Sequence, residues 1–132
     1  MAALTEDAPT PAANEGVQTF KMGVMFRLAG RHKAAATLFV RALSEGVERG
    51  HAAKCHFNLA SSLHELGRDE EACEHYSKAS NLDPSLTEAR TNEAALRIKL
   101  GDPQRAAELC EIVLVFPEST VDFRVLPYPA VF

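Results

Sequence analysis

Apolar residues between positions 17 and 115 recur at helical spacing, and no stretch alternates apolar and polar residues as a strand would. Three glycines divide this pattern, and each follows a leucine-rich segment and precedes an alanine-rich one. They are Gly30, Gly67 and Gly101, placed where a helix would end in a left-handed turn. We therefore predict six helices, at residues 17–28, 32–44, 52–66, 69–81, 85–99 and 103–115.

Residues with capping chemistry stand at several of these boundaries. Asp102 directly precedes a proline and is a good N-cap for the last helix. Ser85 and Glu88 have the spacing of a capping box at the fifth helix, and Asp69 is placed to accept from free amides at the fourth. Pro84 prevents the fourth helix from continuing. These residues support the predicted boundaries independently of the apolar pattern.

The chain also repeats itself. Gly67 and Gly101 are 34 residues apart, and the pairs Ala72 with Ala106 and Asn58 with Asn92 keep this step. Between Gly30 and Gly67 the step is 37, and it is kept by Ala35 with Ala72 and by Phe39 with Tyr76. We predict that the three extra residues lie in the connecting loop around Gly50. A fixed period of this length indicates a stack of repeated helical units.

A helix–turn–helix unit of 34 residues resembles the tetratricopeptide repeat family. The middle unit, about 53–86, matches best, at Leu59, Ala60, Leu63, Gly67, Ala72, Tyr76, Ala79 and Pro84, with His56 where a large aromatic is usual. The first unit, about 16–49, matches at Met22, Gly23, Phe26, Gly30, Ala35, Phe39 and Ala42, with Val47 in place of the closing proline. The resemblance covers residues 16–118 and implies an all-α, right-handed superhelical stack of antiparallel helix pairs.

The third unit, about 87–120, departs most from the family pattern. It keeps Ala94, Gly101 and Ala106, but Glu93 and Arg97 replace an apolar pair. Cys110 replaces the aromatic, and Pro117 comes one place early.

The matched positions have simple packing roles. Small residues let the two helices of a unit approach closely, at Gly23, Ala60 and Ala94 on one helix and at Ala35, Ala72 and Ala106 on the other. Bulky Phe39 and Tyr76 are expected to fill the gap between neighbouring units. Each unit alone cannot bury its apolar face, so the units must stack.

By analogy with the family, the first helix of each unit lines a concave groove that binds a partner. The groove positions are Val17, Phe20, Val24 and Arg27 in unit one, Lys54, Phe57, Asn58, Ser61 and His64 in unit two, and Glu88, Thr91, Asn92, Ala95 and Ile98 in unit three. We predict that a partner contacts these residues, except Val17, Glu88 and Ala95. Phe20, Val24 and Phe57 would make one end of the groove apolar, unless they pack on residues 1–15 or 119–132.

Asn58 and Asn92 hold the same place in successive units. An asparagine amide donates and accepts at once, so the two are suited to pairing with a peptide backbone. The alternative is that they brace the turn or face water. Some relatives bind acidic C-termini with a clamp that contains lysine and arginine. The corresponding places here are held by Phe20, Val24, Asn58, Glu88 and Asn92. Only Asn58 agrees with the clamp pattern, and Glu88 would repel a carboxylate. That ligand is therefore disfavoured.

Composition narrows the function further. The net charge of −4 and the scattered distribution of 14 Lys and Arg residues argue against a nucleic-acid partner, which would need clustered basic side chains. No apolar stretch is long enough for a membrane span, and the first residues do not form a secretory signal. Three cysteines without a framework spacing suggest reduced thiols in the cytoplasm.

No cofactor, metal site or catalytic group is predicted. Cys55-His56, Cys73-Glu74-His75 and His51 match no standard zinc spacing. Cys73 and Cys110 are expected on inward helix faces, where cysteine is a small core residue. No nucleophile–base pair or phosphate-binding glycine loop is visible, so we predict a chain that is not an enzyme.

The two ends differ from the repeats. Residues 1–15 show no apolar period and are predicted to be a disordered lead-in. Residues 119–132 are apolar and contain two prolines. Three interpretations of this tail stay open: it folds over the last helix, it inserts into a partner or a second copy, or the chain is a fragment. The preferred function is a scaffold or adaptor for a protein segment, and the alternative is the regulatory or substrate-recruiting arm of a larger enzyme.

Overall fold

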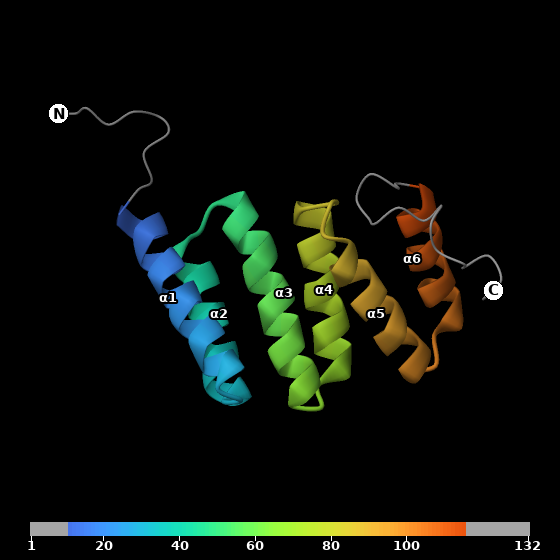
Figure 1. Ribbon diagram of the computed structural model, residues 1–132, viewed down its shortest axis with the longest axis horizontal. Helices are drawn as coiled ribbons and strands as arrows, with labels where there is room; N and C mark the ends of the chain where they lie inside the picture. Colours follow the sequence, from blue (N-terminus) through green and yellow to red (C-terminus); the bar gives the residue numbers. More distant parts are fainter. Residues whose placement is uncertain (1–10, 116–132) are drawn as a thin grey trace.

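The computed structural model describes the backbone of residues 11–115 and the side chains of residues 14–112. Within residues 11–115 the chain forms six α-helices and no strand, as predicted (Figure 1). The helices are α1 (Pro11–Leu28), α2 (His32–Glu45), α3 (Arg49–Glu65), α4 (Asp69–Leu82), α5 (Thr87–Lys99) and α6 (Pro103–Val115).

The helices form a row in chain order (Figure 1). The most extensive packing joins α1 to α2, α3 to α4 and α5 to α6, which are the helix pairs of the three repeats. Neighbouring pairs meet through α2 with α3 and α4 with α5, and α1 also contacts α3. This arrangement is a helical solenoid, and it confirms the predicted fold class.

The three repeat glycines end the first helix of each pair as predicted. Gly30, Gly67 and Gly101 have φ values of 80°, 80° and 85°, which a residue with a side chain rarely adopts. Each turn carries the same two hydrogen bonds. At Gly67, for example, its amide donates to the carbonyl of His64 at 2.9 Å and the Arg68 amide donates to that of Leu63 at 2.8 Å. The turns are therefore local structures that each repeat forms in the same way.

Two of the three predicted helix caps are wrong. Asp102 does cap α6, because its Oδ1 accepts from the Arg105 amide at 3.2 Å. Ser85 does not form a capping box, since α5 begins at Thr87 and the Ser85 amide donates to Oδ1 of Asp83 at 3.1 Å. Asp69 makes no cap hydrogen bond, because its carboxylate faces side chains of α3 and α5 instead.

The first helix is longer than predicted. It begins at Pro11, not at residue 17, so residues 11–15 of the expected lead-in are helical. Proline at the first position of a helix costs nothing, because its missing amide would be unpaired there anyway. The predictions for residues 1–10 and for the tail 119–132 fall outside the described residues.

The three extra residues of the first repeat lie in a helix and not in a loop. The loop before α3 is only residues 46–48, and α3 has 17 residues where α5 has 13. Gly50 is therefore in the first turn of α3. The Arg49 side chain donates from Nε to the carbonyl of Leu82 at 3.0 Å, which ties this extra turn to the end of α4.

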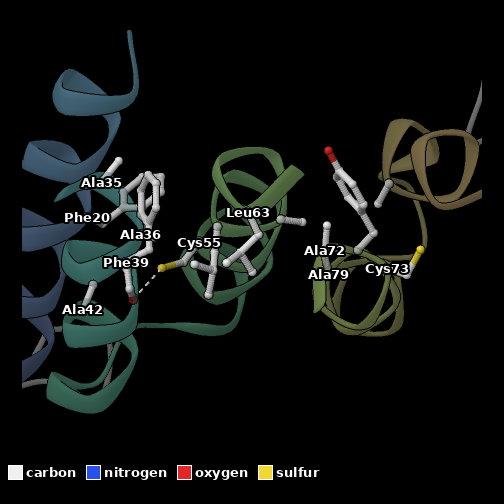
Figure 2. Close-up of a cluster of buried hydrophobic side chains, with 14 of the residues drawn as sticks. Phe20, Ala35, Ala36, Phe39, Ala42, Cys55, Leu63, Ala72, Cys73 and Ala79 are labelled. Carbon is white, nitrogen blue, oxygen red and sulfur yellow. Dashed lines mark hydrogen bonds between the residues drawn. The ribbon is translucent and has the colours of Figure 1, made fainter. Parts of the chain in front are cut away.

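The core runs through α1 to α5 and is built as the repeat positions predict. Phe39 and Tyr76 are buried between units, and Ala35, Ala60 and Ala72 are fully buried beside them. Figure 2 shows Phe20 and Phe39 together, with the Cys55 thiol of α3 directed to the backbone carbonyl of Phe39, 3.3 Å away.

Gly23 illustrates how close the helices approach. A Cβ atom at this position would lie 2.7 Å from Cε1 of Phe39. No larger residue fits between α1 and α2 here without moving the ring. The predicted role of this small residue is confirmed.

The third repeat is held differently. Its apolar core is a separate small cluster of Ala94, Ala106 and Leu109. Glu93 is fully buried and pairs with Arg97 at 3.1 Å and with Arg105 of α6 at 3.7 Å. The two residues that replace the apolar pair thus belong to an ionic cluster between α5 and α6, in which Glu93 is buried and the arginines are partly exposed.

The cysteine prediction is half correct. Cys73 is buried in the main core, but Cys110 is exposed on α6. Cys110 stands at the place of Phe39 and Tyr76, each of which is buried and is followed by a further helix pair. In the described part of the chain, no helix follows α6 to cover Cys110.

Candidate partner-binding groove

The first helices of the three pairs border a hollow of about 560 Å³. It extends from the turn between α1 and α2, across the second half of α3, to the middle of α5, and α4 contributes one side chain. Its lining residues are Arg27, Leu28, Gly30, His32, Ser61, His64, Glu65, Tyr76, Asn92, Ala95 and Leu96.

Four of the predicted partner-binding residues line this hollow, and they come from three helices. Arg27 belongs to α1, Ser61 and His64 to α3, and Asn92 to α5. Repeat equivalence therefore brings distant positions to one surface. Lys54, Thr91 and Ile98 are exposed but do not line the hollow. The Thr91 hydroxyl donates to the carbonyl of Glu88 in its own helix.

The residues predicted to form the apolar end of the groove pack in or against the core instead. Phe20 is buried, with its ring centroid 5.9 Å from that of Phe39 and 6.0 Å from that of His51. Val24 and Phe57 are partly buried and pack against the same core cluster. Phe20 is therefore not accessible to a partner, because the small alanines of α2 leave room for its ring inside.

The two equivalent asparagines have different surroundings. The Asn58 amide donates from Nδ2 to the Lys54 carbonyl of its own helix at 2.8 Å, and it does not line the hollow. Its Oδ1 remains an acceptor. Asn92 lines the hollow directly. Only one of the two equivalent asparagines thus lines the hollow.

A charged network borders the groove. The Nδ1–H of His64 donates to Oδ1 of Asp69 at 2.7 Å, and Lys99 of α5 contacts Oδ2 at 2.9 Å. The hydrogen bond from His64, followed by that from Lys99, holds the pKa of Asp69 below its usual value. The network joins α3, α4 and α5, and therefore fixes the second and third repeats relative to each other.

Ser61, His64 and Asp69 have the residue types of a catalytic triad, but their geometry differs. The Ser61 hydroxyl is 3.1 Å from the Tyr76 hydroxyl, and no hydrogen bond joins Ser61 to His64 among the described residues. A nucleophile needs its base within hydrogen-bond reach. This arrangement positions side chains and does not activate a serine.

Six lining residues were not predicted: Leu28, Gly30, His32, Glu65, Tyr76 and Leu96. His32 and Tyr76 come from second helices, which the family analogy leaves out of the groove. The repeat period in the sequence does single out His32, because it lies 37 residues before Asp69 and so holds the same place in the first repeat. Nε of Arg27 and Nδ1 of His32 are both buried without a hydrogen-bond partner.

A second cluster of titratable groups lies away from the hollow. His56 of α3 and His75 of α4 stack at 5.2 Å, with their Nδ1 atoms 3.0 Å apart. Burial, with the nearby charges of His75 and Lys78, lowers the pKa of His56 to about 4, and burial also lowers that of His75. The described residues contain no group of three or more His, Cys, Asp or Glu side chains that could hold a metal ion.

None of the described helices is long and apolar enough to cross a membrane.

Comparison with known proteins agrees with this architecture. A family model described as tetratrico peptide repeat matches residues 16–117. The TPR domain of Arabidopsis FLU superposes with a TM-score of 0.71 at 24% identity, over 83% of this chain and 100% of that one. MamA superposes with a TM-score of 0.70 at 17% identity, over 78% of this chain. This chain spans 58% of the MamA chain.

The family match covers most of the chain, from within α1 to the end of α6. Repeats of this kind build protein-interaction domains that are generally non-catalytic. The chain belongs to the tetratricopeptide repeat family.

Proposed function

We propose that the chain is a scaffold or adaptor that holds an extended segment of a partner protein in the hollow between α1, α3 and α5. The observation that supports this proposal is that Arg27, Ser61, His64 and Asn92 line one concave surface. These side chains supply donors and acceptors that are suited to a peptide backbone. An extended segment fits better than a compact ligand, because the lining runs across all three repeats.

We further propose that the chain has no catalytic activity of its own and acts in the cytoplasm. The separation of Ser61 from His64 supports the first point, since it leaves the serine without a base. Free thiols at Cys55, Cys73 and Cys110 suit a reducing compartment, which supports the second. The alternative, a regulatory or substrate-recruiting arm of a larger enzyme, would use the same hollow.

The groove is tested by selecting peptides from a random display library on the immobilised full chain. Binding of the selected peptides is then measured by fluorescence anisotropy. Asn92→Ala should weaken binding about tenfold, which is the expected loss of one buried hydrogen bond. The matched control is Asn81→Ala, an exposed residue of α4 that does not line the hollow. Equal binding by the two variants would contradict the proposal.

A separate proposal concerns self-association through residues 119–132. The apolar composition of this segment supports a contact between it and a second copy of the chain. Light scattering of the full chain and of a chain cut after residue 118 tests this directly. The full chain should show a mass that rises with concentration, and the cut chain should be monomeric. A monomeric full chain would exclude self-association.

A further inference from the structure

The end of α1 and the start of α2 repeat the geometry of the next unit with different chemistry. Arg27 and His32 lie 37 residues before His64 and Asp69 and so hold the same places in the first repeat. Arg27 is the penultimate residue of α1, as His64 is of α3, and His32 opens α2 as Asp69 opens α4. In the second repeat the two places hold a hydrogen-bonded donor and carboxylate, 2.7 Å apart.

The first repeat lacks the carboxylate of this pair. Where the second repeat has Asp69, the first has His32, so neither of the two equivalent places holds an acid. Nε of Arg27 and Nδ1 of His32 are buried without a hydrogen-bond partner, and both residues line the hollow. Buried polar groups in folded proteins nearly always have a partner. The Nε–H of Arg27 can only donate, so the site lacks an acceptor, which a ligand can supply.

We propose that this end of the hollow binds a carboxylate, the side chain of an aspartate or glutamate in the bound partner segment. That carboxylate takes the place relative to Arg27 that Asp69 takes relative to His64. Arginine suits this role, because its fork of N–H donors matches a carboxylate and stays charged at all relevant pH values. This proposal rests on the proposed function, since it names one contact of the segment held in the groove.

The other charged groups around the site limit its strength. Glu65 lines the same hollow and is exposed, so its charge opposes an incoming acid. Lys99 contacts Asp69, and Arg31 lies over the ring of Phe26 at 5.0 Å. Arg27 is thus the one lining cation without a carboxylate partner among the described residues. The site recognises one acid at one position and differs from the clamp for acidic C-termini, whose positions this chain does not match.

The test titrates the full chain with N-acetylglutamate amide and, separately, with N-acetylglutamine amide, which differs only in charge. The ring signals of His32 are followed by nuclear magnetic resonance. The glutamate compound should shift them with saturation at about millimolar concentration, and the glutamine compound should bind about tenfold more weakly.

Three variants locate the site. Arg27→Gln should weaken glutamate binding about tenfold, whereas Arg31→Gln, which removes the same charge four residues away, should leave it unchanged. Glu65→Gln should strengthen binding. His32→Asp supplies the missing carboxylate from within the chain, as in the second repeat. Because this variant lacks the His32 ring, the Nε–H signal of Arg27 is followed in it and in the unaltered chain. The glutamate compound should shift that signal only in the unaltered chain. Circular dichroism verifies that each variant keeps its helices.

The inference is overturned if the His32 signals do not move, if both amides act alike, or if Arg27→Gln and Arg31→Gln weaken binding equally. It is also overturned if display-selected peptides show no enriched Asp or Glu while the probe binds, because the site then serves a free carboxylate compound. Each of these results leaves the groove itself to be decided by the Asn92→Ala and Asn81→Ala comparison.

Discussion

Single side chains set how closely the helices of this solenoid approach each other. Gly23 and Gly50 are both glycines inside helices, but only Gly23 faces a neighbouring helix. A Cβ at Gly23 would lie 2.7 Å and 2.9 Å from two atoms of the Phe39 ring, whereas a Cβ at Gly50 would meet nothing within 4 Å. Alanine forms helices better than glycine, so sterics and helix propensity oppose each other at Gly23 but not at Gly50.

Gly23→Ala should lower the free energy of unfolding by about 1–3 kcal/mol, because the added methyl displaces a fully buried ring. Gly50→Ala is the matched control and should be neutral or stabilising by less than about 1 kcal/mol. Urea denaturation followed by circular dichroism measures both. If the two variants have the same midpoint, the tight contact between α1 and α2 is wrong.

The stacked histidines make stability depend on pH. The folded pKa of His56 is about 4, below its ordinary value of 6.5, so the unfolded chain binds the proton more readily. Unfolding therefore takes up protons between pH about 6.5 and about 4, and the free energy of unfolding falls as pH falls through this window. Glu71 and Glu74 raise the pKa of the neighbouring His75, and Lys78 lowers it, but burial dominates.

His56→Phe should flatten this dependence. Phenylalanine keeps a ring where the family usually has a large aromatic, and it removes about one proton from the uptake on unfolding near pH 5. Urea midpoints measured at several pH values between 4 and 7 give the slope for each chain. A slope equal to that of the unaltered chain would show that the pair is not the source of the acid sensitivity.

At the scale of helices, the third pair replaces apolar packing with charge. Glu93 and Arg97 lie 34 residues after Leu59 and Leu63, which are buried in the second pair. Glu93 is fully buried, whereas Arg97 and Arg105 are 28% and 36% exposed. Oε1 of Glu93 has no hydrogen-bond partner. A buried pair of this kind stabilises little in total, but removing one member leaves a buried charge.

Arg97→Leu alone should destabilise the chain by about 3 kcal/mol, because it leaves Glu93 with only the longer contact to Arg105. The double variant Glu93→Leu with Arg97→Leu restores the residue types of the second repeat. It should recover the lost stability or exceed that of the unaltered chain. Thermal unfolding of the single and double variants gives the comparison, and additive losses would contradict the pairing.

At the scale of the whole molecule, stability should vary along the row of helices. Units of a solenoid contact only their neighbours, so the middle repeat is supported on both sides and the end repeats on one. The first repeat shares the main apolar core through Phe20, Ala35 and Phe39, but the third has a small separate cluster. The third repeat is therefore the weakest unit.

Native-state hydrogen exchange should show this order directly. Backbone amides of α6 should exchange fastest among the six helices, those of α5 next, and those of α3 slowest, because local opening needs less free energy where fewer apolar contacts are lost. Mass spectrometry of peptic fragments resolves the helices. Uniform protection from α1 to α6 would mean that the array opens as a single unit.

Much of this fold depends on short stretches of sequence and could therefore be predicted. Five of the six helices begin within three residues of their predicted starts, because glycine turns and the repeat period depend on short stretches of chain. The start of α1 at Pro11 was missed, since no apolar period marks residues 11–15. The extra turn of α3 is predicted as a loop because glycine, here Gly50, disfavours a helix. The hydrogen bond from Arg49 to Leu82 that holds this turn is a tertiary contact, which the local sequence does not show.

The groove could be predicted only in part. Arg27, Ser61, His64 and Asn92 follow from repeat register, since equivalent positions on stacked first helices face the same side. The prediction that Phe20 is accessible to a partner was wrong. An apolar residue at the border of a groove and one in the core have the same helical spacing, so the sequence does not distinguish them. Burial was decided by the space that neighbouring alanines leave.

The sequence by itself determined the helical repeat, the turns at Gly30, Gly67 and Gly101, and the positions of the small residues between helices, because these depend on local backbone preference and on a fixed period. Only the tertiary structure decided which polar atoms are left unpaired. The sequence shows that His32 and Asp69 hold equivalent places, but only the structure shows that Asp69 bonds His64 while Nε of Arg27 and Nδ1 of His32 are buried without a partner. Pairing of buried groups depends on neighbours that are distant in the chain.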